Sequence, residues 1–301
     1  DAATAHRPER FAALAGLQPG DPLTPQAMAA VLAHPEGGRK GCPPGAIPLL
    51  YLNLARDQAA SQIGAERRLA AARSIAAQVL AGPPPAFRAV LIGSAQAAEP
   101  VDEVHGRTAA IVLAAGGSAR FAGEAAKQLL PWQPGGTLVG RAADIALAAR
   151  AIGEIVVVTG HRAHEVQAAL GDRPVRTMFN HDWQAGQSSS VAAGLRALGP
   201  DVAAVVFVLA DQPDVDSATV DLLVERHRRT LAPVVAPVYQ GGQRGNPVLF
   251  DRRTFPELLT LQGDTGGRPV IQRYGLDVQM VEIDAPLPRG IETMEDYRRL
   301  S

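Results

Sequence analysis

The chain has 301 residues, 47% of them hydrophobic, and it carries 29 basic against 30 acidic residues. That length suffices for roughly two domains with cores of their own, and the balanced charge offers no basic field for nucleic acid or an anionic membrane. Cys42 is the single cysteine, which excludes an internal disulfide and fits a reducing compartment, and no apolar run reaches the roughly 20 residues of a membrane span. We therefore expect a cytoplasmic protein that binds neither nucleic acid nor membranes.

The first third of the chain is rich in alanine and proline and shows few regular patterns. Its spacing of apolar residues predicts a helix over residues 61–80 and a short strand over 89–93. Residues 99–108 are polar and lack periodicity, which favours a connection between domains. We expect a smaller, partial α/β segment over residues 1–107 and a second domain over residues 108–301.

From Ala109 onward, short apolar runs alternate with helical patterns. Such an alternation predicts an α/β fold, a largely parallel Rossmann-like sheet with helices on both faces. Strands are predicted at 109–115, 155–159, 175–179, 204–210, 234–238, 247–250 and 278–283, and helices at 139–151, 163–170, 189–198 and 217–231. In sheets of this kind ligands bind outside the carboxyl ends of the strands.

The strand predicted at 109–115 ends in a glycine turn that two basic residues follow. The turn is Gly116, Gly117 and Ser118, and the cations are Arg120 and Lys127. Glycines let a backbone approach an anion closely, and the cations offset its charge, so this segment suits a triphosphate. Neither a Walker A loop nor a dinucleotide fingerprint is present. An ordinary turn between strand and helix with solvated charges is the alternative.

Asp211 directly follows the apolar run over 203–210, where the chain leaves the sheet. Mg²⁺ binds few protein carboxylates and keeps water and phosphate ligands, so one aspartate at a strand end can hold it. The alternative is that Asp211 caps the next turn.

Asn180 begins a segment that leads from a strand into a helix with three serines at its start. Capping accounts for one serine, and a helix N-terminus with further hydroxyls suits a ribose, base or phosphate group. We interpret His181 and Trp183 in this segment as packing residues. The loops over 241–247 and 263–268 each combine glycines with an arginine, and are either ordinary turns or a clamp for a second anionic substrate.

These features together resemble the MobA-like nucleotidyltransferases, over residues 109–301. Their signature, L-A-A-G-x-S-x-R-M/F-G-x-x-K, is matched in place by Leu113, Ala114, Ala115, Gly116, Ser118, Arg120 and Phe121, and in type by Gly123 and Lys127, one and two residues late. The nearest branch is similar to the molybdenum cofactor cytidylyltransferases, which join CTP to molybdopterin and release pyrophosphate. Ala115, where guanylyl-transferring relatives have glycine, favours CTP. Later motifs of this branch are resembled by residues 186–194, 209–213, 244–250 and 263–268.

The resemblance implies a role for each residue type singled out above. Arg120, Lys127 and Asp211 would be catalytic, with Mg²⁺ or Mn²⁺ on Asp211 and Glu292. CTP would be bound by Leu113, Ala114, Ala115, Gly116, Gly117, Ser118, Asn180, Gly186, Ser188 and Ser189, and the molybdopterin-type acceptor by Arg244, Asn246, Asp264 and Arg268. Relatives often read D-I-D-T-P-E-D where this chain has residues 290–296, so that Glu292 is the acidic residue left for a metal there.

Residues 21–106 resemble, more loosely, part of a YqeC-like accessory protein for selenium-dependent molybdenum hydroxylases. Because no phosphate loop precedes them, they look like a truncated nucleotide-binding domain, whose role would be docking to an apo molybdenum hydroxylase. Two alternatives to the cytidylyltransferase stay open. One is a nucleotidyltransferase for another phosphorylated small molecule, and the other is a non-catalytic maturation factor that binds the finished cofactor.

Overall fold

The computed structural model describes residues 49–54, 62–80, 89–94, 102–117, 126–133 and 136–300. The chain divides into two compact units, Asp1–Gly106 and Arg107–Ser301, which are treated separately below. Of the predicted site residues, Ser118 and Arg120 lie outside the described residues, as does Cys42.

The described residues of the first unit form a three-stranded sheet and one helix. Strands β1 (Leu49–Leu54) and β2 (Ala89–Ser94) are parallel and are joined through α3 (Gln62–Leu80), so the predicted helix and the strand after it are present. Strand β3 (Asp102–His105) pairs antiparallel with β2. The segment over 99–108, which the sequence indicates as a connection between domains, thus contains a short strand that the sequence analysis did not predict. A polar strand of this length is too short to give a period-2 signal, and its pairing depends on β2.

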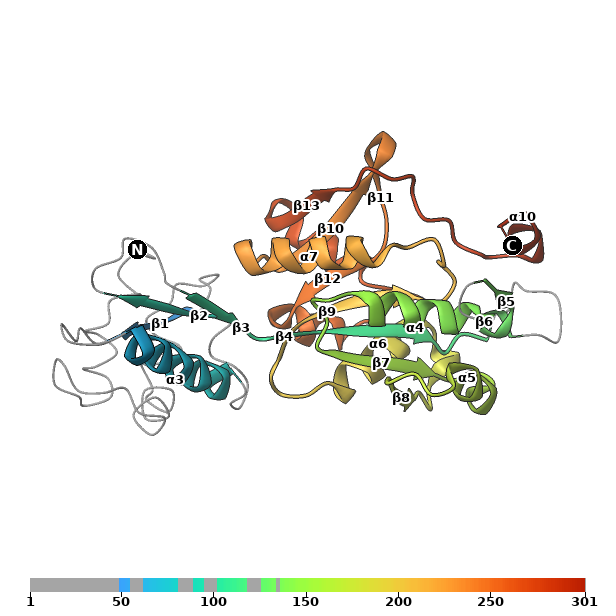
Figure 1. Cartoon of the computed structure of the whole chain (residues 1–301). Helices are drawn as coiled ribbons and strands as arrows, with labels where there is room; N and C mark the ends of the chain where they lie inside the picture. Colours follow the sequence, from blue (N-terminus) through green and yellow to red (C-terminus); the bar gives the residue numbers. More distant parts are fainter. Residues whose placement is uncertain are drawn as a thin grey trace. The chain divides into compact units, whose positions relative to one another are not determined.

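The second unit is built on an eight-stranded sheet whose central part is parallel (Figure 1). The parallel strands are β4 (Arg107–Ala114), β7 (Glu154–Thr159), β8 (Arg176–Phe179) and β9 (Val202–Leu209), in the spatial order β8-β7-β4-β9. The remaining strands are β10 (Val234–Tyr239), β11 (Gln243–Arg244), β12 (Val248–Asp251) and β13 (Val278–Glu282). The chain moves outward from β4 through β7 to β8 and returns to β9 on the other side of β4, so a topological switch point lies between β4 and β9.

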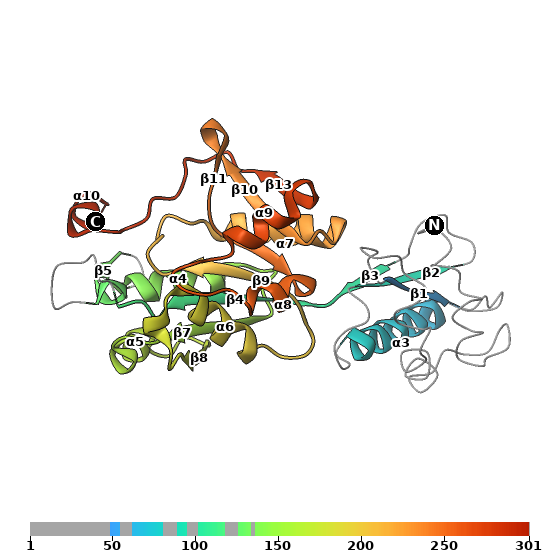
Figure 2. The ribbon, with the colours of Figure 1, turned by 180° about the vertical axis from the view of Figure 1, so that it is seen from behind.

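Helices cover both faces of this sheet, as the alternation of strands and helices predicts. One face carries α4 (Leu138–Ala148), α5 (Ala163–Leu170) and α7 (Ser217–Thr230), and the other carries α6 (Gln187–Ala197), α8 (Phe255–Leu258) and α9 (Arg268–Tyr274) (Figures 1 and 2). Strand β4 divides between the two cores residue by residue, since Ala110 and Val112 pack on the first face and Ile111 on the second. Nowhere in the described stretches is a helix long and apolar enough to cross a membrane.

The C-terminal segment returns from β13 to the carboxyl ends of the parallel strands. It ends in α10 (Met294–Leu300), which packs with the short strand β5 (Pro131–Trp132), the partner of β6 (Gly136–Thr137), near the start of α4 (Figure 1). The fully buried Ile291 anchors this return, and its backbone N–H donates to the carbonyl of Asp211 over 2.9 Å. Residue 292 is thereby carried to the end of β9.

Candidate active site

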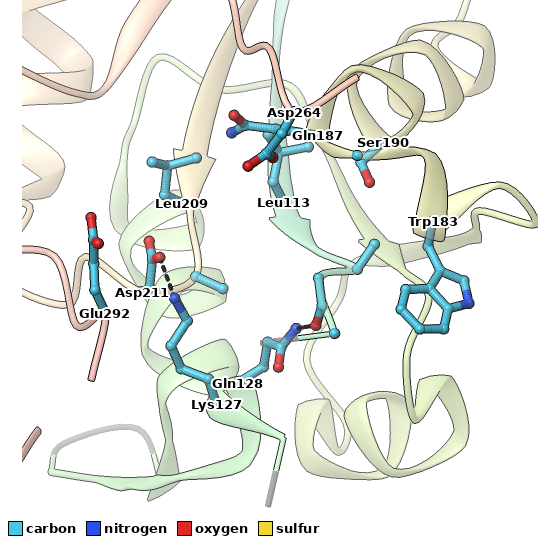
Figure 3. Close-up of a pocket in the computed structure, with 15 residues that line it drawn as sticks. Leu113, Lys127, Gln128, Trp183, Gln187, Ser190, Leu209, Asp211, Asp264 and Glu292 are labelled. Atoms are coloured by element: carbon cyan, nitrogen blue, oxygen red, sulfur yellow. Dashed lines mark hydrogen bonds and ion pairs between the residues drawn. The ribbon is translucent and has the colours of Figure 1, made fainter. Parts of the chain in front are cut away.

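A cavity of about 440 Å³ opens where β4 and β9 end, at the switch point of the sheet (Figure 3). Seven separate parts of the second unit contribute to it: the end of β4 and the turn after it, residues 127–128, Trp183, the start of α6, the end of β9, the loop at 264 and the loop at 292. Its lining residues are Leu113, Ala115, Gly116, Gly117, Lys127, Gln128, Trp183, Gly186, Gln187, Ser190, Leu209, Ala210, Asp211, Asp264 and Glu292. A site at this position agrees with the ligand-binding edge of open α/β sheets.

Lys127 and Asp211 form an ion pair in the cavity wall. Lys127 Nζ lies 2.7 Å from Asp211 Oδ2, and the two side chains are 18% and 29% exposed. Lys127 begins a one-turn 3-10 helix, Lys127–Leu129, while Asp211 lies two residues after the end of β9. Residues 84 positions apart are therefore brought into contact at the point where sequence reasoning placed the triphosphate and the metal. A lysine here puts positive charge next to a carboxylate that faces the same cavity.

Glu292 adds a second carboxylate at the charged end of the cavity (Figure 3). Among the residues that the structure describes, no group of three or more histidine, cysteine, aspartate or glutamate side chains could hold a metal ion. The pair Asp211 and Glu292 nevertheless fits Mg²⁺ or Mn²⁺ in a site completed by substrate, because such ions need only one or two protein carboxylates when phosphate oxygens and water fill the other positions.

Gln128 holds the glycine turn by hydrogen bonds from its side chain. Its side chain is 3% exposed, and its Nε2 donates to the carbonyl of Ala114 over 3.2 Å and to that of Gly116 over 2.5 Å. Two carbonyl oxygens at the start of the turn are thus occupied by a neutral donor inside the protein. Carbonyl oxygens that face a phosphate repel it, so this arrangement favours an anion at the turn.

The segment between β8 and α6 is organised by Asn180. This side chain is 4% exposed, and its Nδ2 donates to the hydroxyls of Ser189 and Ser190 over 2.8 and 3.1 Å, while its Oδ1 accepts from the N–H of Asp182. Trp183 follows and lines the cavity as well as packing against the core, so its interpretation as a packing residue alone is incomplete.

The loop that carries Asp264 is seated on the start of α6. The N–H and hydroxyl of Ser188 both donate to the carbonyl of Gly263, over 3.1 and 2.8 Å. Gly186 has φ +101°, and a Cβ there would lie 2.4 Å from the carbonyl carbon of Gly263. Only glycine allows this approach, which brings Asp264 and Gln187 to the same wall of the cavity (Figure 3).

The structure gathers about half of the predicted site residues in the cavity. The predicted residues that line it are Leu113, Ala115, Gly116, Gly117, Lys127, Gly186, Asp211, Asp264 and Glu292. Sequence reasoning did not assign Gln128, Trp183, Gln187, Ser190, Leu209 or Ala210 to the site. Gln128, Gln187, Ser190 and Ala210 directly flank assigned residues, Leu209 lies two residues before Asp211, and Trp183 lies in the segment already singled out. Proximity to the motifs was therefore the available signal.

Other predicted residues lie outside that lining set, within the described ranges. Ala114, Asn180, Ser188 and Ser189 are placed beside the cavity and are engaged in the hydrogen bonds given above. Arg244, Asn246 and Arg268 also lie outside the set.

Tyr239 ties down the loop that contains Asn246. The Tyr239 hydroxyl donates to the carbonyl of Asn246 over 2.6 Å, and Asn246 precedes a cis proline. Burial raises the pKa of Tyr239 to about 12. The loop with Asn246 is thus held by a neutral buried phenol.

Comparison with known proteins identifies related sequences and structures. Residues 110–278 match the model of the MobA-like NTP transferase domain. The nicotine blue oxidoreductase of Paenarthrobacter nicotinovorans is 31% identical over 202 residues, which are 63% of this chain and 94% of the relative.

Two solved structures are similar to the second unit. Rv0371c of Mycobacterium tuberculosis H37Rv, in a complex with manganese, is 27% identical with a TM-score of 0.56, over 65% of this chain and 98% of the other. A nucleotidyl transferase from Methanothermobacter thermautotroptrophicus is 25% identical with a TM-score of 0.55, over 64% and 95%.

Proposed function

Since the chain belongs to the family of MobA-like NTP transferases, and is thus a nucleotidyltransferase, we propose that it transfers CMP from CTP to a molybdopterin-type acceptor and releases pyrophosphate. The observation that carries the proposal is the Lys127–Asp211 pair, set beside the glycine turn at the switch point of the sheet. The relevant chemistry needs local positive charge and a carboxylate for a metal at one place.

In the proposed reaction an oxygen of the acceptor's terminal phosphate attacks the α-phosphorus of CTP. A new phosphorus–oxygen bond forms to the acceptor while the bond between the α-phosphorus and the bridging oxygen of the β-phosphate breaks, and pyrophosphate leaves with that oxygen. The attacking phosphate is already an anion, so no side chain has to remove a proton from it. Catalysis then depends on position and charge.

The residues at the charged end of the cavity would bind the phosphates of CTP. Lys127 offsets negative charge on the triphosphate and the leaving pyrophosphate, and the turn at Gly116 and Gly117, held by Gln128, presents backbone to the phosphates. Asp211 and Glu292 would hold a Mg²⁺ or Mn²⁺ ion, whose charge offsets that of the triphosphate. Arg120 matches the arginine of the family signature, and it would add positive charge at the triphosphate. Manganese in the complex of Rv0371c supports a divalent ion.

The choice of substrates, which is part of the proposal, depends on other residues. Ala115 in the cavity wall is the residue that favours CTP over GTP. Asp264 and Gln187 offer hydrogen-bond acceptors on another wall, which suits the N–H groups of a pterin. The acceptor would contact Arg244, Asn246 and Arg268 only at its periphery. Residues 1–107 would dock to an apo molybdenum hydroxylase, and the single cysteine supports a cytoplasmic location.

A second candidate function is reduction of an oxidised dye-like substrate, which the name of the Paenarthrobacter relative favours. It would require a reductant such as a nicotinamide dinucleotide, for which the chain lacks the usual glycine fingerprint. The charged end of the cavity favours phosphate chemistry over hydride transfer.

One assay separates these functions. The purified chain is incubated with Mg²⁺ or Mn²⁺, with CTP, GTP or ATP, and with molybdopterin or another phosphorylated small molecule, and pyrophosphate release is measured. We expect release only when CTP and molybdopterin are both present. Release with a different acceptor would replace the acceptor in the proposal. Absence of release with tight binding of the cofactor would favour the non-catalytic maturation factor, and oxidation of NADH coupled to nicotine blue would favour the oxidoreductase.

A further inference from the structure

Trp183 is an aromatic side chain in the lining of the cavity. It begins a one-turn 3-10 helix, Trp183–Ala185, between β8 and α6. Figure 3 shows its indole on one side of the cavity and Lys127, Asp211 and Glu292 on the other, with Asp264 on another wall. The cavity is therefore polarised, with a charged end and an aromatic end.

Two glycines make room for this indole. A Cβ on Gly117 would lie 2.7 Å from Trp183 Cζ3, and a Cβ on Gly160 would lie 2.6 Å from Trp183 Cβ. The ring of His161 is 5.2 Å away, centroid to centroid, at 50°. The indole is thus fixed by close contacts with the glycine turn and with the end of β7, and a side chain at either glycine would displace it. Such pre-organisation lowers the entropic cost of stacking a ligand on the ring.

We propose that Trp183 is the residue on which the nucleobase of the NTP packs, an inference that rests on the proposed nucleotidyl transfer. A nucleoside triphosphate has the same polarity as the cavity, since its phosphates are charged and its base is a flat, neutral ring system. With the phosphates at Lys127, the base extends away from that end, and Trp183 offers an aromatic surface there. Every base has a π-face, so stacking supplies affinity without choosing between bases.

Discrimination between bases then falls to other residues of the cavity wall, Ala115 and Ser190 among them. Ser190 lines the cavity, and its hydroxyl accepts a hydrogen bond from Asn180. This bond fixes the direction in which the hydroxyl can form further hydrogen bonds. Loss of the indole should therefore raise the Kd for CTP and the Kd for GTP by the same factor.

The first test uses fluorescence, because the chain contains only two tryptophans. Trp132→Phe leaves Trp183 as the sole reporter, and Trp132 lies in β5 outside the cavity lining of the described residues. We expect CTP to quench or shift this emission, and inorganic tripolyphosphate, which lacks a base, to leave it nearly unchanged. An equal response to both ligands would overturn the inference.

The second test compares Trp183→Leu with Trp183→Phe and with Trp132→Leu as a matched control. Loss of one stacked base weakens binding at least about fivefold. We therefore expect Trp183→Leu to raise the Kd for CTP by that factor or more, Trp183→Phe to restore most of it, and Trp132→Leu to have no effect. The Kd for tripolyphosphate should stay constant in all variants, whereas collapse of the glycine turn would raise it together with that for CTP.

The outcomes separate this inference from the function on which it rests. CTP that binds to Trp183→Leu as tightly as to the wild type would overturn the role of Trp183 and leave the transfer reaction intact. A raised Kd for tripolyphosphate would assign Trp183 to the support of the turn instead. A wild-type chain that binds no NTP in calorimetry would overturn both.

Discussion

Replacing Gly186 by alanine should unseat the loop that carries Asp264. At φ +101° and ψ −179°, Gly186 occupies a backbone region open essentially to glycine, which for alanine costs on the order of 1–3 kcal/mol. The added Cβ would also lie 2.4 to 2.6 Å from three backbone atoms of Gly263 and Asp264. Backbone cannot rotate out of the way, so the two hydrogen bonds from Ser188 to the Gly263 carbonyl must lengthen or break.

The structure provides a matched control at Gly171, which ends α5 with φ +58° and has no atom within 4 Å of the point that a Cβ would occupy. Gly171→Ala therefore suffers backbone strain alone. Two hydrogen bonds at about 0.5–1.5 kcal/mol each predict that Gly186→Ala lowers the free energy of unfolding by about 1–3 kcal/mol more than Gly171→Ala does.

Urea unfolding followed by circular dichroism measures both free energies, and pyrophosphate release measures the effect on the cavity. We expect Gly186→Ala to lose turnover because Asp264 and Gln187 shift, and Gly171→Ala to keep it. Equal destabilisation by the two substitutions, or full activity of Gly186→Ala, would refute the reasoning from the close approach at Gly263.

Three further predictions concern other parts of the second unit. Gln128→Leu leaves two carbonyls at the glycine turn without their donor, so calorimetry should show weaker binding of NTP, and an unchanged Kd would mean that the turn does not depend on this amide. Burial favours the neutral form of Tyr239, so its contribution to stability is complete below pH about 10 and is lost as the pH rises to about 12. Tyr239→Phe should therefore remove one late step from the titration of phenolate absorbance. Retention of that step would contradict the assignment. The hydrogen bond from Arg107 lowers the pKa of Asp201, so the pair stabilises the fold above pH about 4, and this contribution is lost as the pH falls. The Asp201→Asn variant should therefore unfold more easily than the wild type at pH 7 but not at pH 2. A difference in stability that is independent of pH would count against the pair.

The strands that position the site could be predicted from sequence because each carries its own signal. β4 and β9 are long apolar runs with a turn or polar residue directly after them, so their burial on both faces and the placement of Gly116 and Asp211 at one edge followed from composition and the rule for parallel sheets. Lys127 was singled out as a cation after the glycine turn and was then matched to the signature lysine, although the segment before it is longer than in the signature. The structure places it against Asp211.

The parts that sequence reasoning missed depend on contacts between distant segments. The serines at the start of α6 are typical of a ligand-binding helix N-terminus, yet Ser188 bonds Gly263, 75 residues away, and Ser189 bonds Gly186 and Asn180. Trp183 lines the cavity only because Gly117 and Gly160 lack side chains. No local sequence pattern reveals such free space, because it arises only where three loops meet in the folded chain.

The role of Asp211 in nucleotidyl transfer can be measured directly with a pair of matched substitutions. Asp211→Asn removes the carboxylate that faces Lys127 in the cavity, and Asp214→Asn makes the same change three residues later, at an exposed carboxylate paired with Arg289. Turnover of CTP with the acceptor and a divalent ion should fall by about a hundredfold or more in Asp211→Asn and stay within about twofold in Asp214→Asn. Circular dichroism should show both variants folded. Near-normal turnover in a folded Asp211→Asn variant would contradict the account.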